Sequence, residues 1–159
     1  MSGGGPVEER IWKETPALEP IFEQHGVVLA YLYGSQGRGD AGPLSDVDVA
    51  VLFQAGLDPK ERWRRRLALT QDLMGIFRRY DLFVADLAEA SPLLKNEVRR
   101  EGRLLYCADE SVRVEFEVET LRQFVDTQPL RDLRWHYLLE RIEQGRMGQY
   151  QGEFVDGQG

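Results

Sequence analysis

One stretch of the chain, residues 34–48, constrains the fold more than any other. It reads Gly-Ser-Gln-Gly-Arg-Gly-Asp-Ala-Gly-Pro-Leu-Ser-Asp-Val-Asp, and it follows an apolar run, Val27–Tyr33, with the length and composition of a buried strand. Valines at alternate positions after it predict a second strand that begins at about Asp46. The sequence therefore predicts a glycine-rich loop that ends on two carboxylates at the entrance of a strand.

These carboxylates, Asp46 and Asp48, are expected on one face of the second strand, with Cβ atoms roughly 7 Å apart, because side chains alternate along a strand. Such a pair can share two divalent ions roughly 3.5–4 Å apart, an arrangement that supports phosphoryl or nucleotidyl transfer. A third carboxylate would complete the ligand set and help to take the proton of the acceptor hydroxyl. Asp81, at the start of a strand-like run to Leu87, is our candidate, since Asp86 is expected on the opposite face of that strand.

The loop itself has the chemistry to bind phosphate. Gly34 lets the backbone approach a phosphate closely, Ser35 offers an amide and a hydroxyl as donors, and Arg38 could add a charged donor. A lone Gly-Ser or Asp-x-Asp is typical of a turn, but both together, flanked by strands, indicate a site. A Rossmann loop or P-loop is excluded, because the glycine spacing fits neither pattern and a strand follows the loop.

Gly34-Ser35, ten residues and Asp46-x-Asp48 together resemble the Gly-Ser-x10-Asp-x-Asp signature of the DNA polymerase beta nucleotidyltransferase superfamily. The likeness is closest to its minimal nucleotidyltransferase (MNT) members, since Arg38-Gly39 and Ser45 also match them. It continues over roughly residues 18–140 and resembles the MNT antitoxins of MntA type, which are paired with HEPN-domain ribonuclease toxins. Further matching segments are Asp81-Leu82-Phe83-Val84, Ser91-Pro92-Leu93-Leu94, Glu101-Gly102-Arg103-Leu104-Leu105-Tyr106, Phe116-Glu117 and Asp126.

The resemblance implies a polymerase-beta-type sheet and transfer of AMP from ATP to a tyrosine hydroxyl of a HEPN toxin, which silences the toxin. Asp46 and Asp48 would bridge two Mg²⁺ ions, and Asp81 would bind the ion near the acceptor and assist its deprotonation. The residues expected to hold the β- and γ-phosphates are Gly34 and Ser35, with Arg38 as an auxiliary charge.

Two other functions fit the sequence. A small-molecule nucleotidyltransferase of the aminoglycoside-modifying kind shares the motif, but it usually needs an additional helical domain, and only about 50 residues follow Cys107. A non-catalytic partner that masks a toxin is the second alternative. The three carboxylates count against masking, because a mask has no need to gather acidic side chains at one point.

The rest of the chain predicts an α/β domain, a small mixed sheet with packed helices. A helix is expected from Pro59, capped by Asp58, and a second from Pro92 to Glu101. Residues 103–107 are expected to form a fourth strand. The inward stripe of the first of these helices is predicted to be Trp63, Leu67, Thr70, Met74 and Phe77, widened by Leu73 and Ile76.

Beyond Ser111 the pattern is ambiguous, because residues 112–118 alternate like a strand but continue at helical spacing. We interpret this stretch as a helix, as the resemblance favours, and expect a last helix with an apolar face from Pro129. The expected organisation is a flexible segment over residues 1–17, a single nucleotidyltransferase domain over 18–144 that includes the C-terminal helices, and a flexible tail over 145–159.

Composition narrows the class of protein further. A net charge of −7 argues against an extended nucleic-acid surface. No segment has the length of a membrane span and the N-terminus lacks the features of a signal peptide, so we expect a cytoplasmic protein without a membrane partner. The single cysteine, Cys107, is expected to be a structural thiol, and His25 and His136 have no neighbours at zinc-binding spacing.

Overall fold

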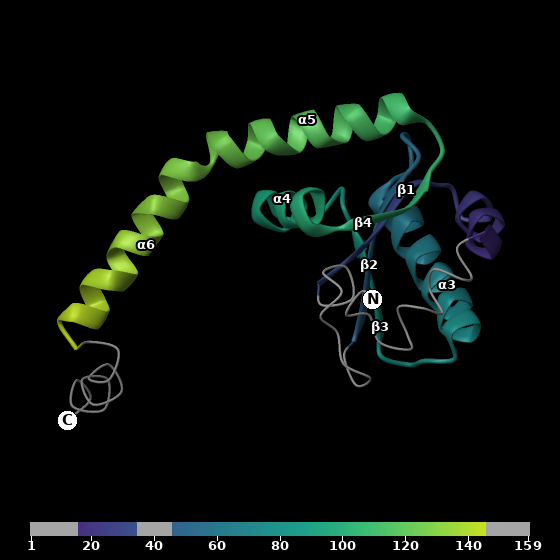
Figure 1. Cartoon of the computed structure of the whole chain (residues 1–159), viewed down its shortest axis with the longest axis horizontal. Helices are drawn as coiled ribbons and strands as arrows, with labels where there is room; N and C mark the ends of the chain where they lie inside the picture. Colours follow the sequence, from purple (N-terminus) through teal and green to yellow (C-terminus); the bar gives the residue numbers. More distant parts are fainter. Residues whose placement is uncertain (1–15, 35–45, 146–159) are drawn as a thin grey trace, which may run out of the picture. The chain divides into compact units, whose positions relative to one another are not determined.

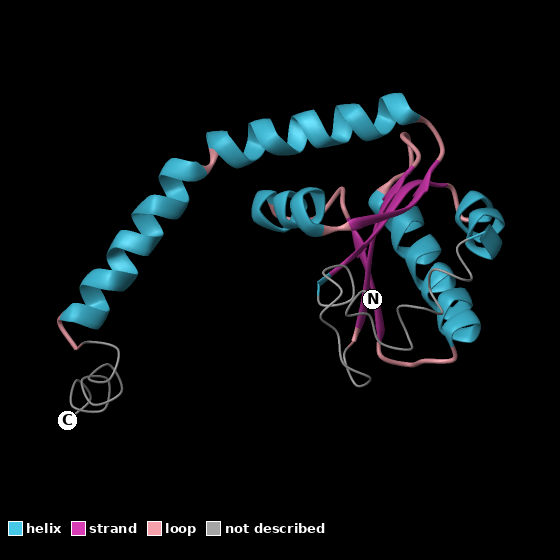
Figure 2. Ribbon diagram, in the orientation of Figure 1, coloured by secondary structure: helices cyan, strands magenta, loops and turns pink. Residues whose placement is uncertain are grey.

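The fold is of the α/β class, a small mixed sheet with helices on both faces (Figures 1 and 2). The structure is a computed structural model that describes residues 16–34 and 46–145. Its elements are a helix over residues 16–24, β1 (Val27–Tyr33), β2 (Val47–Phe53), α3 (Pro59–Phe77), β3 (Leu82–Asp86), α4 (Pro92–Glu101), β4 (Arg103–Cys107), α5 (Glu110–Asp126) and α6 (Gln128–Glu143). The expected α/β class is confirmed, including the helix after Ser111.

The four strands follow the order β3-β2-β1-β4. β1 pairs antiparallel with both β2 and β4, whereas β2 and β3 are parallel. A parallel pair needs a crossover, and α3 supplies it. The parallel β2–β3 pair brings the start of β2 beside the start of β3, and the antiparallel β1–β2 pair brings the end of β1 beside the start of β2.

Each face of the sheet has its own apolar core. On one face, α3 and the helix over residues 16–24 cover the odd-numbered valines of β2 through Leu69, Leu73 and Phe22. On the other face, α4 and the first part of α5 pack on β1 and β2 through Val98 and Phe116. The side chains at the start of β2 therefore alternate between the core beneath α3 and the face that carries α4.

The inward stripe of α3 is rotated relative to the prediction. Trp63 was expected to face inward, but 55% of it is exposed, and Leu67 is also exposed. Two arginines occupy the inward positions instead: Arg62 Nε donates to Asp86 Oδ2 at 2.8 Å, and Arg65 donates to the carbonyl of His25 at 3.2 Å. Charged residues can face the sheet here because each finds an acceptor there.

The ends of α3 and α4 follow the predicted signals. The side chains of Asp58 and Ser91 each accept a hydrogen bond from the backbone N–H three residues later, and proline follows each cap. α4 ends at Gly102, where an added Cβ would lie 2.4 Å from the carbonyl oxygen of Val98. Gly102 has a φ of −71°, so close contact and not a left-handed backbone is the reason for glycine.

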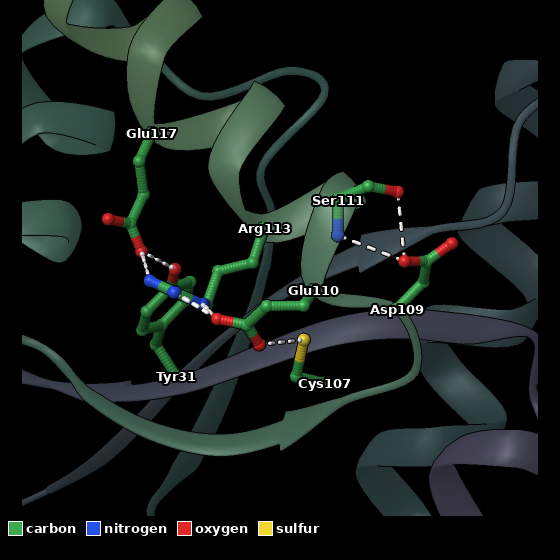
Figure 3. Close-up of polar contacts among 7 residues, drawn as sticks. All are labelled: Tyr31, Cys107, Asp109, Glu110, Ser111, Arg113 and Glu117. Atoms are coloured by element: carbon green, nitrogen blue, oxygen red, sulfur yellow. Dashed lines mark hydrogen bonds and ion pairs between the residues drawn. The ribbon is translucent and has the colours of Figure 1, made fainter.

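A polar network joins α5 to β1 (Figure 3). The Tyr31 hydroxyl donates to Glu117 at 2.9 Å, and Arg113 donates to Glu117 at 2.9 Å and also to Glu110. Burial, and then the bond to Glu117, raise the pKa of Tyr31. Phe116 packs beside the Tyr31 ring, with centroids 6.1 Å apart. One side of α5 is thus fixed on the sheet by both apolar and polar contacts.

Residues in the first turn of α5 form hydrogen bonds to β4 and to the residue that precedes the helix (Figure 3). The Asp109 carboxylate accepts hydrogen bonds from the Ser111 amide at 2.9 Å and from the Ser111 hydroxyl at 2.8 Å. The Cys107 thiol lies 3.5 Å from the Glu110 carboxylate, and burial raises its pKa. Burial at this position disfavours the reactive thiolate form of Cys107.

The chain divides into two compact units, Met1–Leu121 and Arg122–Gly159. In the second unit, Arg131 donates to the Phe124 carbonyl at 2.6 Å and its guanidinium lies 3.8 Å from the centre of the Phe124 ring. α6 contains no buried residue. Within the described part of the chain, no helix combines the length and the apolar character that a membrane crossing requires.

Candidate active site

The strand register gathers the predicted carboxylates at one end of the sheet. Asp48 is paired with Tyr33 of β1 on one side and with Phe83 of β3 on the other. The Val47 amide donates to the Asp81 carbonyl at 3.0 Å, and Val47 is paired with Leu82. Asp46 and Asp81 directly precede that pair, so they enter the two parallel strands side by side.

Gly34 lies directly against the Asp48 carboxylate. Its φ is +71°, a backbone conformation that glycine adopts without strain, and a Cβ added there would lie 2.8 Å from Asp48 Oδ2. The backbone at the start of the loop therefore lies so close to the Asp48 carboxylate that there is no room for a side chain at residue 34. The remaining loop residues, including the predicted phosphate ligands Ser35 and Arg38, lie outside the described residues.

This contact predicts that Gly34→Ala lowers both catalysis and stability. The methyl group would displace the Asp48 carboxylate and would sit on a left-handed backbone, which costs roughly 1–2 kcal/mol. We expect a loss of free energy of unfolding of that order in urea denaturation, with any reaction that depends on the Asp48 carboxylate slowed at least about tenfold. Gly56→Ala is the matched control: its φ is +91° but an added Cβ meets nothing within 4 Å, so only stability should fall.

Like charges lie close together at the acidic end of the sheet. Burial raises the pKa of Asp48 first, and the nearby carboxylates of Asp46 and Glu97 raise it further. The pKa of Tyr33 is raised to about 12 by burial and then by Asp48 and Glu97. Such mutual repulsion is relieved by a bound cation. Glu97, on α4, was not predicted from the sequence as part of this region.

Asp81 has a fixed partner. Arg79 Nε donates to Asp81 Oδ1 at 2.6 Å, and a second guanidinium nitrogen bonds Oδ2, so the pair is bidentate. Hydrogen bonding to Arg79 lowers the pKa of Asp81. Asp86, at the other end of β3, lies on the opposite face as expected, where it accepts from Arg62.

The donor set suits magnesium that arrives with a nucleotide. Within residues 16–34 and 46–145, no three acidic, histidine or cysteine side chains lie close enough together to form a ready metal-binding group. Mg²⁺ is commonly held by one or two carboxylates together with substrate phosphates and water. Asp46 and Asp48 match that requirement, with Asp81 beside them but engaged by Arg79.

Comparison with known proteins points to one family. Residues 17–111 match the family described as "Polymerase beta, Nucleotidyltransferase". The protein adenylyltransferase MntA of Shewanella oneidensis is 31% identical over 100 residues, which are 63% of this chain and 68% of the relative.

Solved structures share the fold. A chain in the crystal structure of a toxin–antitoxin complex with AMP-PNP aligns with a TM-score of 0.62 and 27% identity, covering 83% of this chain and 98% of that chain. A structure of the tri-AMPylated Shewanella oneidensis HEPN toxin in complex with MNT antitoxin aligns with a TM-score of 0.62 and 24% identity, covering 81% and 98%. The second likeness is one of fold alone.

Proposed function

Because the chain belongs to the polymerase beta nucleotidyltransferase family, among relatives of MntA type, we propose that it transfers AMP from ATP to a tyrosine hydroxyl of a HEPN-domain ribonuclease toxin. In this role it acts as the antitoxin, and we place it in the cytoplasm with its partner. The observation that carries the proposal is the placement of Asp46, Asp48 and Asp81 at the same end of the sheet, with Gly34 against Asp48.

Asp46 and Asp48 would hold two Mg²⁺ ions together with the phosphates of ATP. Their mutual repulsion, together with Glu97, favours a cation at this point. Magnesium, when bound, supplies positive charge to the phosphate oxygens as the α-phosphate is transferred. The Gly34 backbone, Ser35 and Arg38 would hold the β- and γ-phosphates of the leaving pyrophosphate.

Asp81 would act on the acceptor side. Arg79 holds it ionised, so its free lone pairs can accept a hydrogen bond from the acceptor hydroxyl and orient it. The hydroxyl oxygen forms a bond to the α-phosphorus, the bond from that phosphorus to the bridging oxygen breaks, and pyrophosphate leaves. The hydroxyl proton passes by way of Asp81 to solvent.

The experiment is intact mass spectrometry of a co-expressed or genetically neighbouring HEPN protein after incubation with this chain, Mg²⁺ and each NTP in turn. We expect a gain of about 329 Da per event with ATP, lost when Mg²⁺ is omitted and in Asp46→Ala. A stable complex without any mass gain would replace transfer by masking. Transfer to small hydroxylated compounds, without a complex, would instead favour the small-molecule alternative.

A further inference from the structure

Arg79 lies beside the acidic site, at the turn that follows α3. It follows the end of α3, where Arg78 adopts a left-handed backbone with a φ of 55° and where the Arg79 amide donates to the Met74 carbonyl at 3.2 Å. Its side chain is only 12% exposed, whereas that of Asp81 is 38% exposed. The Arg79 side chain is therefore mostly covered by the protein, whereas the carboxylate that it bonds is accessible to a ligand.

The positive charge of Arg79 acts on more than one carboxylate. The bond to Asp81 raises the pKa of Arg79 most, and the charge of Asp46 raises it further. The charges of Asp46 and Glu97 in turn both raise the pKa of Asp48. Arg79 thus lies at one edge of a group of negative charges that, in the described part of the chain, forms no complete metal-binding set.

Resting on the proposed function, we propose that Arg79 is the internal counter-ion of this site and makes cation binding depend on the nucleotide. Both Asp81 oxygens are bonded to Arg79, so a cation that reaches Asp81 competes with the guanidinium. Of the three predicted carboxylates, Asp46 and Asp48 are then left for the cation in the free chain, and two carboxylates bind Mg²⁺ weakly. ATP adds phosphate oxygens and its own negative charge, which shift the balance toward the cation.

The test measures Mn²⁺ binding by the electron paramagnetic resonance signal of free Mn²⁺, with and without AMP-PNP. In the wild-type chain, we expect AMP-PNP to tighten Mn²⁺ binding at least about tenfold. Arg79→Gln should tighten binding to the nucleotide-free chain by about tenfold, because it removes one positive charge a few ångströms from the site. Arg79→Ala makes the same charge change and should give the same result if the glutamine variant does not fold.

Two controls separate charge at the site from net charge. Arg64→Gln changes the net charge equally on an exposed part of α3 and should leave Mn²⁺ affinity within about twofold of wild type. Arg79→Lys keeps the charge and loses the bidentate geometry, so it should bind Mn²⁺ like wild type while transferring AMP more slowly.

The outcomes also separate this inference from the proposed function. Unchanged or weaker Mn²⁺ binding in both Arg79→Gln and Arg79→Ala, in a chain whose wild type binds Mn²⁺ with AMP-PNP, would overturn the counter-ion role alone. A wild-type chain that binds no Mn²⁺ even with AMP-PNP would overturn the proposed function and this inference together.

Discussion

Asp48→Asn is expected to lower the rate of AMP transfer at least about a thousandfold without lowering stability at neutral pH. The loss of rate follows because positioning and neutralisation of phosphate charge supply most of the catalysis in nucleotidyl transfer, and Asp48 is half of the central carboxylate pair. The unimpaired stability follows from the electrostatics of the free chain, in which burial, Asp46 and Glu97 all raise the pKa of Asp48, so that the charged form is disfavoured in the folded state.

The stability of wild type relative to Asp48→Asn should fall as the pH rises, because the pKa of Asp48 is raised in the folded state. A carboxyl whose pKa is higher in the folded state is destabilising when ionised, so its cost is present above the folded pKa and disappears below the unfolded pKa. Asp48→Asn should therefore be at least as stable as wild type at pH 7 and equal to it at about pH 3, in urea denaturation followed by circular dichroism. The effect is small because Asp48 is partly exposed.

Asp58→Asn is the matched control. Asp58 caps α3 by accepting from the Glu61 amide at 2.8 Å, and asparagine caps a helix about as well as aspartate. Neither the transfer rate nor the stability should change. A marked loss of stability in Asp48→Asn at pH 7, or retention of transfer, would show that Asp48 is a structural and not a functional carboxylate.

The sequence alone was sufficient to predict the strands and the end of the sheet at which the carboxylates lie. Alternation along β2 puts Asp46 and Asp48 on one face whatever the strand order, and the turn residues at Asp58, Ser91 and Gly102 mark helix ends locally. These features depend only on neighbours in sequence, and so they can be predicted without tertiary structure.

Features that depend on partners far along the chain could not be predicted. Trp63 was expected to face inward because it is apolar, but Arg62 takes that position by pairing with Asp86, 24 residues away. Glu97 reaches the site only because α4 packs on β1, and no local pattern marks it. Arg79 stands two residues before Asp81 in the sequence, but its bidentate contact with Asp81 depends on the turn after α3.

Asp81, directly before β3, and Asp86, the last residue of β3, provide the sharpest test of the site, because the same substitution should have opposite consequences at the two positions. Asp81→Asn should reduce AMP transfer at least about a hundredfold, since a neutral amide is a poor partner for a cation and a weaker acceptor for the acceptor hydroxyl. Its effect on stability should be small, because Asp81 is partly exposed and its pairing with Arg79 is screened by water.

Asp86→Asn should show the reverse. The Asp86 side chain is only 4% exposed, and it accepts from Arg62 at 2.8 Å and from the Ala88 amide at 3.0 Å, on the face of the sheet that α3 covers. Removing its charge leaves Arg62 with the longer and more exposed ion pair to Glu89, at 3.6 Å, which should lower Tm by roughly 5–10 °C. Transfer measured well below that Tm should stay within about threefold of wild type. If Asp86→Asn abolished transfer in a folded chain while Asp81→Asn did not, the site would lie on the α3 face of the sheet and the assignment of Asp81 would be wrong.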